Sequence, residues 1–198
     1  RYVKSDVKEL LWQPILEIYR TQRREMTAIA LIAATFAFQL SATVNFMSKY
    51  LQETHHYAPP QVSLLFIVAG SIALFGTTVA GRVSDRVGRR PTLVVALLMN
   101  CLANLAFYNT SGFLLPLAWI AALFSFFAVE VMINAIGGEL FTTRCRSTAA
   151  TLRSIASMFA AVAGLAIEGS LFNVLGSHAA AISLLCLSSL LALPVIIL

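Results

Sequence analysis

The sequence predicts an all-α membrane protein with six transmembrane helices. Its composition points away from an ordinary globular chain, because 59% of the 198 residues are hydrophobic and only 12% are charged. Globular domains have about 45–50% apolar and about 25% charged residues. The apolar residues also gather into six stretches that approach or exceed the length of about 20 residues needed to cross a bilayer. Short polar segments separate these stretches, and together with residues 1–25 they carry most of the charge.

The six predicted spans follow one another with little sequence between them. They are Met26–Phe46, Val62–Gly81, Thr92–Tyr108, Phe113–Ile136, Thr148–Leu175 and Ala179–Leu198. Residues 1–25 before them are charged but carry apolar side chains at helical spacing, which is typical of an amphipathic helix lying on a membrane surface. A charged linker with partial helicity fits them equally well. We therefore divide the chain into a cytoplasmic amphipathic linker, 1–25, and a six-helix membrane domain, 26–198.

The arginine residues predict the orientation of these spans. Basic residues cluster in the N-terminal segment, after the second span and after the fourth, whereas the other side of the membrane carries only Lys49. Cytoplasmic loops are enriched in Lys and Arg. Both ends of the chain should therefore face the cytoplasm, in a plasma membrane or an inner membrane.

Two spans carry stripes of small residues, which allow helices to approach closely in lipid. We predict that both stripes pack against other helices, including helices outside this chain. Glu168 continues the stripe of the fifth span, so we favour a structural or gating role for it. The stripe of the second span is Ala69, Ala73, Gly76 and Ala80, and that of the fifth includes Ser157, Ala161 and Gly164.

The first and fourth spans carry the polar side chains expected around a cavity. The candidates for binding a solute or a proton are Glu130, Asn134, Gln39, Asn45 and Phe127. An intramembrane carboxylate is energetically unfavourable and indicates a functional site. At about 1.5 Å per residue from the start of its span, Glu130 lies about 25 Å deep, in the inner half of the membrane. A substrate or proton site and a structural partner of a neighbouring helix are equally compatible with it.

The remaining chemistry-bearing residues predict no cofactor, no bound metal and no nucleic-acid partner. Three cysteines, Cys101, Cys145 and Cys186, lack the spacing of a metal site or a disulfide framework. We expect each to be a small buried hydrophobe. No phosphate-binding loop of the G-x-x-x-x-G-K-[ST] type occurs in the sequence, which disfavours ATP hydrolysis by this chain.

Two segments that follow spans carry distinctive sequence motifs. The segment after the second span reads GRVSDRVGRRP, in which we expect Gly81 and Gly88 to form a tight reversal. Asp85, Arg86, Arg89 and Arg90 supply its charges. This segment is similar to the G-x-x-x-D-R-x-G-R-R motif of the major facilitator superfamily. The segment GELFTTRCRST after the fourth span, which begins at Gly138, resembles a motif of the sugar, organic-ion and metabolite–proton symporters, although Thr142 stands where proline is usual.

This resemblance implies that the chain is the C-terminal half of a transporter, built as two inverted three-helix repeats. The first and fourth helices would line a cavity, the second and fifth would meet an N-terminal six-helix half, and the third and sixth would lie outside. Cytoplasmic ion pairs would control gating. We expect Asp85 to pair with Arg146 or Arg153. Glu139 would pair with Arg86 or Arg90.

The resulting functional prediction is a secondary transporter that moves a small organic solute by alternating access, as a proton symporter. One alternative is an exporter of drugs or lipids, suggested by the phenylalanines near Glu130. Another is a non-transporting membrane receptor or an intramembrane enzyme. The enzyme is disfavoured because no H-E-x-x-H or G-x-S-x-G motif occurs in the sequence.

Overall fold

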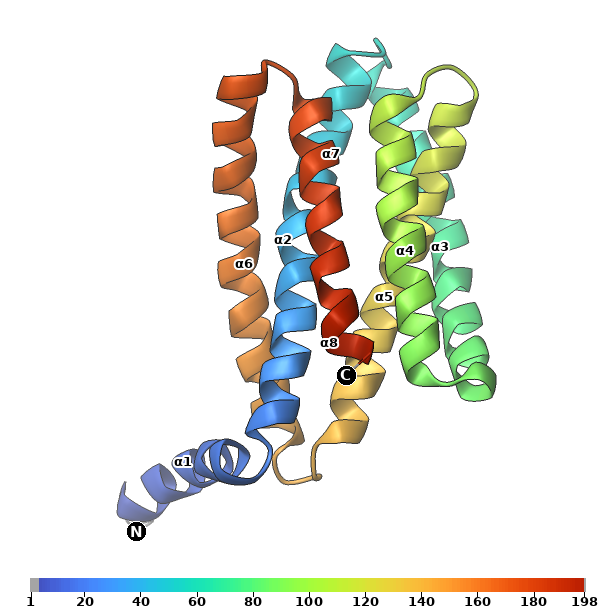
Figure 1. Ribbon diagram of the computed structural model, residues 1–198. Helices are drawn as coiled ribbons and strands as arrows, with labels where there is room; N and C mark the ends of the chain where they lie inside the picture. The colour runs from blue at the N-terminus through green and yellow to red at the C-terminus, as the bar shows by residue number, and fades with distance from the viewer. Residues whose placement is uncertain (1–3, 198) are drawn as a thin grey trace.

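A computed structural model describes residues 4–197, and these fold into a bundle of long helices (Figure 1). Six helical segments are long and apolar enough to span a membrane, which confirms the predicted number of spans. The chain is therefore an integral membrane protein. The elements are α1 Lys4–Thr21, α2 Arg23–Glu53, α3 Pro59–Val87, α4 Arg89–Asn109, α5 Leu114–Leu140, α6 Arg146–Leu175, α7 His178–Ser188, a 3-10 turn Ser189–Ala192 and α8 Leu193–Ile197.

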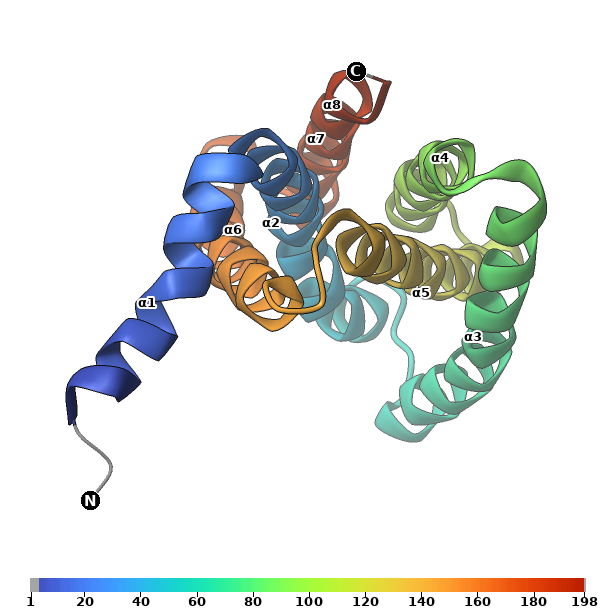
Figure 2. The ribbon, with the colours of Figure 1, turned by 90° about the horizontal axis from the view of Figure 1, so that it is seen from below.

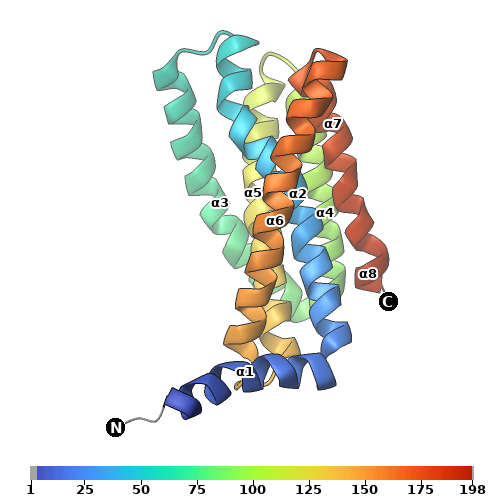
Figure 3. The same ribbon diagram turned by 90° about the vertical axis from the view of Figure 1, so that its left-hand side faces the viewer.

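The two ends of the bundle differ in their connections. At one end, which we call the arginine-rich end, α1 joins α2, α3 joins α4 and α5 joins α6. The connections α2–α3, α4–α5 and α6–α7 lie at the opposite end (Figure 1). Helix α1 lies across the arginine-rich end, roughly at right angles to the bundle (Figure 3). Its Ile18 is buried, whereas Trp12 and Tyr19 are exposed. The helix predicted within residues 1–25 is thus present, and its contact with a membrane surface stays a prediction.

Helix contacts reveal an internal repeat. Helix α2 packs against α6 and α7, and α5 packs against α3 and α4, so the bundle consists of two trios that lie side by side (Figure 2). Each trio combines helices from both halves of the sequence. The first helix of each sequential half contacts the second and third helices of the other half. The three helices α2–α4 run up, down and up, whereas α5–α7 run down, up and down (Figure 1). Because the two halves make equivalent contacts in opposite orientations, they are two inverted three-helix repeats.

The small-residue stripes pack inside this chain, not against helices outside it. On α3 the side chains of Ala69, Ala73 and Ala80 are buried. A Cβ added at Gly76, on the same face of α3, would lie 2.9 Å from the Phe124 side chain of α5.

On α6, a Cβ at Gly164 would collide with the backbone oxygen of Phe38 on α2. Ser157 and Ala161, earlier in this stripe, are half-buried. Both stripes therefore serve the α3–α5 and α2–α6 contacts. The expectation that the two small-residue stripes pack against helices outside this chain is therefore wrong at their buried positions.

The remaining faces of α3 and α6 are the most exposed parts of the bundle. Only 22% of the most apolar stretch of α3 and 11% of that of α6 is buried, against 39–44% in the other spans. Large apolar side chains cover these faces, among them Leu64, Ile67, Leu74, Phe75, Met158, Phe159 and Val162. The predicted core cysteines, by contrast, are all buried and free.

Candidate functional site

The predicted loop between the second and third spans is almost entirely helical. Helix α3 continues to Val87 and α4 begins at Arg89, so Gly88 alone forms the turn. Its backbone has φ 108° and ψ 156°, a conformation that residues other than glycine rarely adopt. Gly81 lies within α3 and takes no part in the reversal, contrary to the expectation that both glycines would shape it.

The ion pairs at this turn have different partners from those predicted. An Arg89 terminal nitrogen lies 2.7 Å from Asp85 Oδ1, and Arg89 Nε donates to Glu139 Oε1 at 2.9 Å. Arg89 also donates to the Ser84 hydroxyl. Because the turn is a single residue, Arg89 falls one helical turn from Asp85, and the packing of α4 on α5 brings Glu139 to it. Arg89 therefore links α3, α4 and α5.

Four other arginines had been expected to take these roles. Arg146 and Arg153 do not pair with Asp85, and Arg86 and Arg90 do not pair with Glu139, within the ion pairs that the described residues form. Arg146 lies at the start of α6 and lines a small cavity instead. The predicted acids are thus in an ion-pair network, but with Arg89 at its centre.

A second polar cluster joins α5 to α6 inside the spans. Asn134 Nδ2 donates to the Glu130 backbone oxygen at 2.9 Å and lies 3.4 Å from Glu130 Oε2. The Asn134 side-chain oxygen accepts a hydrogen bond from Arg153 at 2.7 Å. The amide of Asn134 therefore stands between a carboxylate and a guanidinium. The predicted pair, Glu130 and Asn134, therefore has Arg153 as a cationic partner. The sequence had led us to expect Arg153 to pair with Asp85.

Two small cavities flank this cluster, between α2, α5 and α6. One of about 170 Å³ is lined by Phe36, Glu130, Arg153, Ser154 and Ser157, among others. The other, of about 150 Å³, contains Asn134 and Arg153 in its wall. Pockets for drug-sized ligands measure about 300–1,000 Å³. In this conformation each of these cavities therefore suits water or an ion, and a solute site of ordinary size needs further walls.

The other three predicted binding residues make their described contacts with other residues. Gln39 is fully buried and donates to Thr43 Oγ1 at 3.3 Å, so it does not line a cavity here. Asn45 is exposed but donates to the Ser41 backbone oxygen of its own helix at 2.6 Å. Phe127, one turn before Glu130 on α5, packs on Phe126, with ring centroids 4.8 Å apart. The hydrogen bonds of the described residues join Glu130 to Asn134 but to neither Gln39 nor Asn45.

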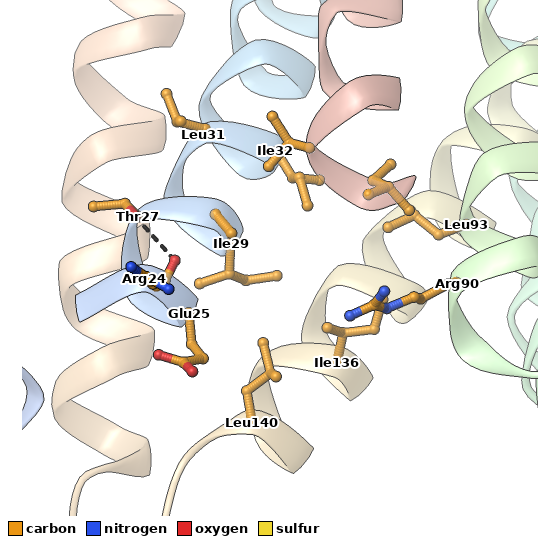
Figure 4. Close-up of a pocket in the computed structure, with 13 residues that line it drawn as sticks. Arg24, Glu25, Thr27, Ile29, Leu31, Ile32, Arg90, Leu93, Ile136 and Leu140 are labelled. Carbon is orange, nitrogen blue, oxygen red and sulfur yellow. Dashed lines mark hydrogen bonds between the residues drawn. The ribbon is translucent and has the colours of Figure 1, made fainter. Parts of the chain in front are cut away.

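A larger cavity of about 580 Å³ was not foreseen from the sequence (Figure 4). It lies at the arginine-rich end between α2, α4, α5 and α8. Its walls are mainly aliphatic, and Arg24, Glu25 and Arg90 supply its charged groups. The sequence feature that comes closest to predicting this cavity is the position of Arg24 and Arg90 at the starts of two spans.

Glu168 is buried at the opposite end, and its partner was also missed. Its Oε1 lies 2.6 Å from Nδ1 of His178, the first residue of α7. Its side chain is 0% exposed. The expected structural role fits this burial. The sequence did contain a signal for this pair. His178, at the start of the last span, follows Glu168 of the preceding span by ten residues.

Two inverted repeats of three apolar helices, with an acid–arginine network at a glycine turn, define a membrane-embedded bundle of the kind found in transport proteins. The Major Facilitator Superfamily model matches residues 29–198, and the chain belongs to this family. No curated protein matches the chain.

Among solved structures, the bundle is similar to a bacterial homologue of the human lysosomal transporter Spinster, crystallised in an inward-facing and unoccupied conformation. The TM-score is 0.64 with 16% sequence identity, so the likeness concerns the fold. The match covers 100% of this chain and 50% of the Spinster homologue. The chain thus spans about half the length of that protein.

Proposed function

We propose that this chain is the C-terminal half of a secondary transporter, which moves a small organic solute across the membrane by alternating access coupled to protons. The observation that carries the proposal is the Glu130–Asn134–Arg153 cluster. An ionisable group within a spanning helix is rare unless it serves an ion or a solute. Here the carboxylate and the guanidinium lie beside small cavities within a fold of the Major Facilitator Superfamily.

The exposed faces of α3 and α6 support a second, N-terminal half as partner. These two helices occupy equivalent places in the two repeats, and both leave wide apolar faces uncovered by the rest of the chain. A six-helix partner seated on α3 and α6 would enclose the side of the bundle that carries Glu130 and Asn134. The solute cavity would then form between the halves, which accounts for the small size of the two cavities beside Glu130 and Asn134.

The hydrogen bonds of the cluster support proton coupling. When ionised, Glu130 accepts from the Asn134 amide, whose oxygen is held by the Arg153 cation. A proton on Glu130 removes the negative charge that this arrangement stabilises, and so weakens the link between α5 and α6. The free-energy difference between two conformations of a transporter is a few kcal/mol, which such a change can bias.

The test is a proton-flux assay in proteoliposomes that hold the complete two-half protein. Wild type and Glu130→Gln are challenged with a panel of metabolites while a pH-sensitive dye reports internal acidification or alkalinisation. The control is Glu17→Gln, which removes a carboxylate of α1 outside the spans. We expect a solute-dependent proton signal in wild type and control that Glu130→Gln abolishes. An unchanged signal in Glu130→Gln would remove Glu130 from the coupling path.

The same assay addresses the alternatives. Competition by lipophilic cations in place of metabolites would indicate an exporter of drugs or lipids. The phenylalanines that suggested this reading pack on one another, as Phe36 does on Phe126 at 6.1 Å, and so serve the core. Saturable flux of any solute would exclude a non-transporting receptor.

A further inference from the structure

Glu168 is a carboxylate with no access to water in this bundle. One of its oxygens lies 2.6 Å from His178 Nδ1, and the other has no hydrogen-bond partner among the described residues. Burying an ionised carboxylate is strongly unfavourable unless it is paired. The imidazole of His178 is therefore what allows Glu168 to remain inside, and an unused acceptor oxygen remains beside it.

His178 is held between two aromatic rings and a lysine. Its ring stacks on Phe172 of α6 and Phe46 of α2, with centroids 4.0 Å and 4.6 Å away. Its second nitrogen, Nε2, lies 3.4 Å from Lys49 Nζ on α2. Lys49 also lies 3.8 Å from Glu53, one turn further along α2. The imidazole thus connects three helices, α2, α6 and α7.

One tautomer of His178 satisfies both of these contacts. Because a lysine ammonium group can only donate, the contact with Lys49 is a hydrogen bond when Nε2 of His178 accepts. In that tautomer Nδ1 carries the proton and donates it to Glu168. A neutral imidazole in this position lies between a cation and an anion.

We propose that Lys49, His178 and Glu168 form a proton-binding site at the opposite end of the bundle, separate from the Glu130 cluster. A proton from the adjoining solution binds Nε2 of His178. The N–H···N hydrogen bond from Lys49 then breaks, because both groups have become donors, and the ammonium group moves to Glu53. The site gains one proton and loses the Lys49–His178 hydrogen bond, which loosens α2 from α6 and α7.

The surroundings of the site permit this exchange. A cavity of about 270 Å³ is lined by Lys49, Glu53, Phe172 and His178, among others, and gives water a path to the imidazole. The half-exposed Lys49 side chain, 47% accessible, has room to move. Imidazole is the side chain whose charge changes between about pH 5 and pH 8.

The other titratable groups near the site are two tyrosines, a cysteine and His55, whose ring centroid lies 5.0 Å from that of Tyr50. From α2, Tyr50 faces the site and donates to the Tyr108 backbone oxygen at 3.0 Å. From α4, Tyr108 donates to the Thr43 backbone oxygen at 2.6 Å. Cys186 of α7 is buried and free. Glu53 and Lys49 on α2 are the charged groups that respond to the proton.

The test follows the histidine itself, and it needs no transported solute. The complete two-half protein, labelled with ¹⁵N-histidine and held in lipid nanodiscs, is titrated by NMR, and His178→Asn assigns the signal. We expect the Nε2 signal of His178 to change from the unprotonated form to the protonated form as the pH is lowered.

Two variants probe the neighbours of the imidazole. Glu168→Gln removes the negative charge beside the imidazole and should make protonation of His178 less favourable. Lys49→Gln removes the positive charge and should make it more favourable. The control is His56→Asn, an exposed histidine at the same end with φ 55°, a conformation that asparagine accepts. It should leave the His178 titration unchanged.

Three results would overturn the site. These are a His178 signal that does not change with pH, a titration unaffected by Glu168→Gln, or a titration unaffected by Lys49→Gln. Lys49 lies at the exposed edge, so Lys49→Gln keeps the proposal testable even where Glu168→Gln fails to fold. None of these results depends on the proton signal of Glu130 in proteoliposomes, so the two proposals can fail separately.

Discussion

The two ends of the bundle hold their charges in different ways. At the arginine-rich end, the acids bound to Arg89 are largely in contact with solvent, with side-chain exposures of 64% for Asp85 and 56% for Glu139. At the opposite end, Glu168 is 0% exposed and its partner His178 is 18% exposed. Exposed ion pairs contribute little to stability, whereas a buried charge that loses its partner destabilises strongly. The acids at the arginine-rich end can therefore exchange partners at little energetic cost, whereas the buried Glu168 cannot.

The two networks also belong to different trios of helices. Arg89 connects α3, α4 and α5, and His178 connects α2, α6 and α7, which are the two groups that lie side by side in Figure 2. The bond between Asn134 and Arg153 joins one trio to the other. Each trio is thus held together by its own polar network, and the Glu130 cluster lies where the two trios meet.

The largest expected effect tests the buried end. His178→Ala leaves the Glu168 carboxylate buried without its partner, which should lower the free energy of unfolding by about 3–5 kcal/mol. Thermal unfolding of the purified protein in detergent measures this, with His56→Asn as the matched control. A loss no larger than that of the control would mean that Glu168 is already neutral, and the contrast between the two ends would disappear.

A smaller effect is expected where α2 and α6 approach most closely. Gly164→Ala introduces a methyl group against the Phe38 backbone oxygen, which cannot move aside as a side chain could. Overpacking of this kind should destabilise the protein by about 3 kcal/mol. Gly169→Ala is the control, because a Cβ at that position of the same helix meets nothing within 4 Å. Equal melting temperatures for the two variants would show that the α2–α6 contact is looser than the bundle indicates.

The smallest effect on stability is expected at the arginine-rich end. Asp85→Asn keeps the shape of the side chain and removes one exposed charge, so the melting temperature should stay close to that of wild type. The transport rate of the complete protein in proteoliposomes should fall, because the Arg89 network is proposed to set the balance between conformations. Wild-type rates in Asp85→Asn would remove the gating role, and a large loss of stability would show that this end is as firmly held as the other.

The sequence predicted the spans well but not where their helices end. Hydropathy placed the end of the first span at Phe46, whereas α2 continues to Glu53. Polar residues such as Lys49 continue a helix as readily as apolar ones when the backbone hydrogen bonds are made. Helix ends therefore depend on turns such as Gly88, which the composition of a segment does not reveal.

Periodicity predicted which faces are small but not what they pack against. The stripe through Gly76 was recognised, yet its neighbour, Phe124, lies on a helix of the same chain. Spacing describes one helix at a time, and the choice of neighbour depends on the packing of all six.

The candidate site was predicted in part for the same reason. Glu130 and Asn134 are one turn apart on one helix, so their proximity could be derived from the sequence. Arg153, Arg89 and His178 meet their partners across helices or across a turn. Side-chain spacing along the sequence contains no information on those distances. Where a partner was assigned to Asp85 or Glu139 from the sequence, the structure pairs the acid with Arg89 instead.

The single-residue turn at Gly88 has a mechanical consequence. A tether of one residue leaves no slack between α3 and α4, so a tilt of α3 is transmitted directly to α4. The connection between α5 and α6 at the same end has five residues, 141–145, and gives those helices freedom to slide past each other. The two connections at this end therefore differ in flexibility. Helices α3 and α4 move together as one rigid hairpin, whereas α5 and α6 can shift relative to each other where Asn134 contacts Arg153.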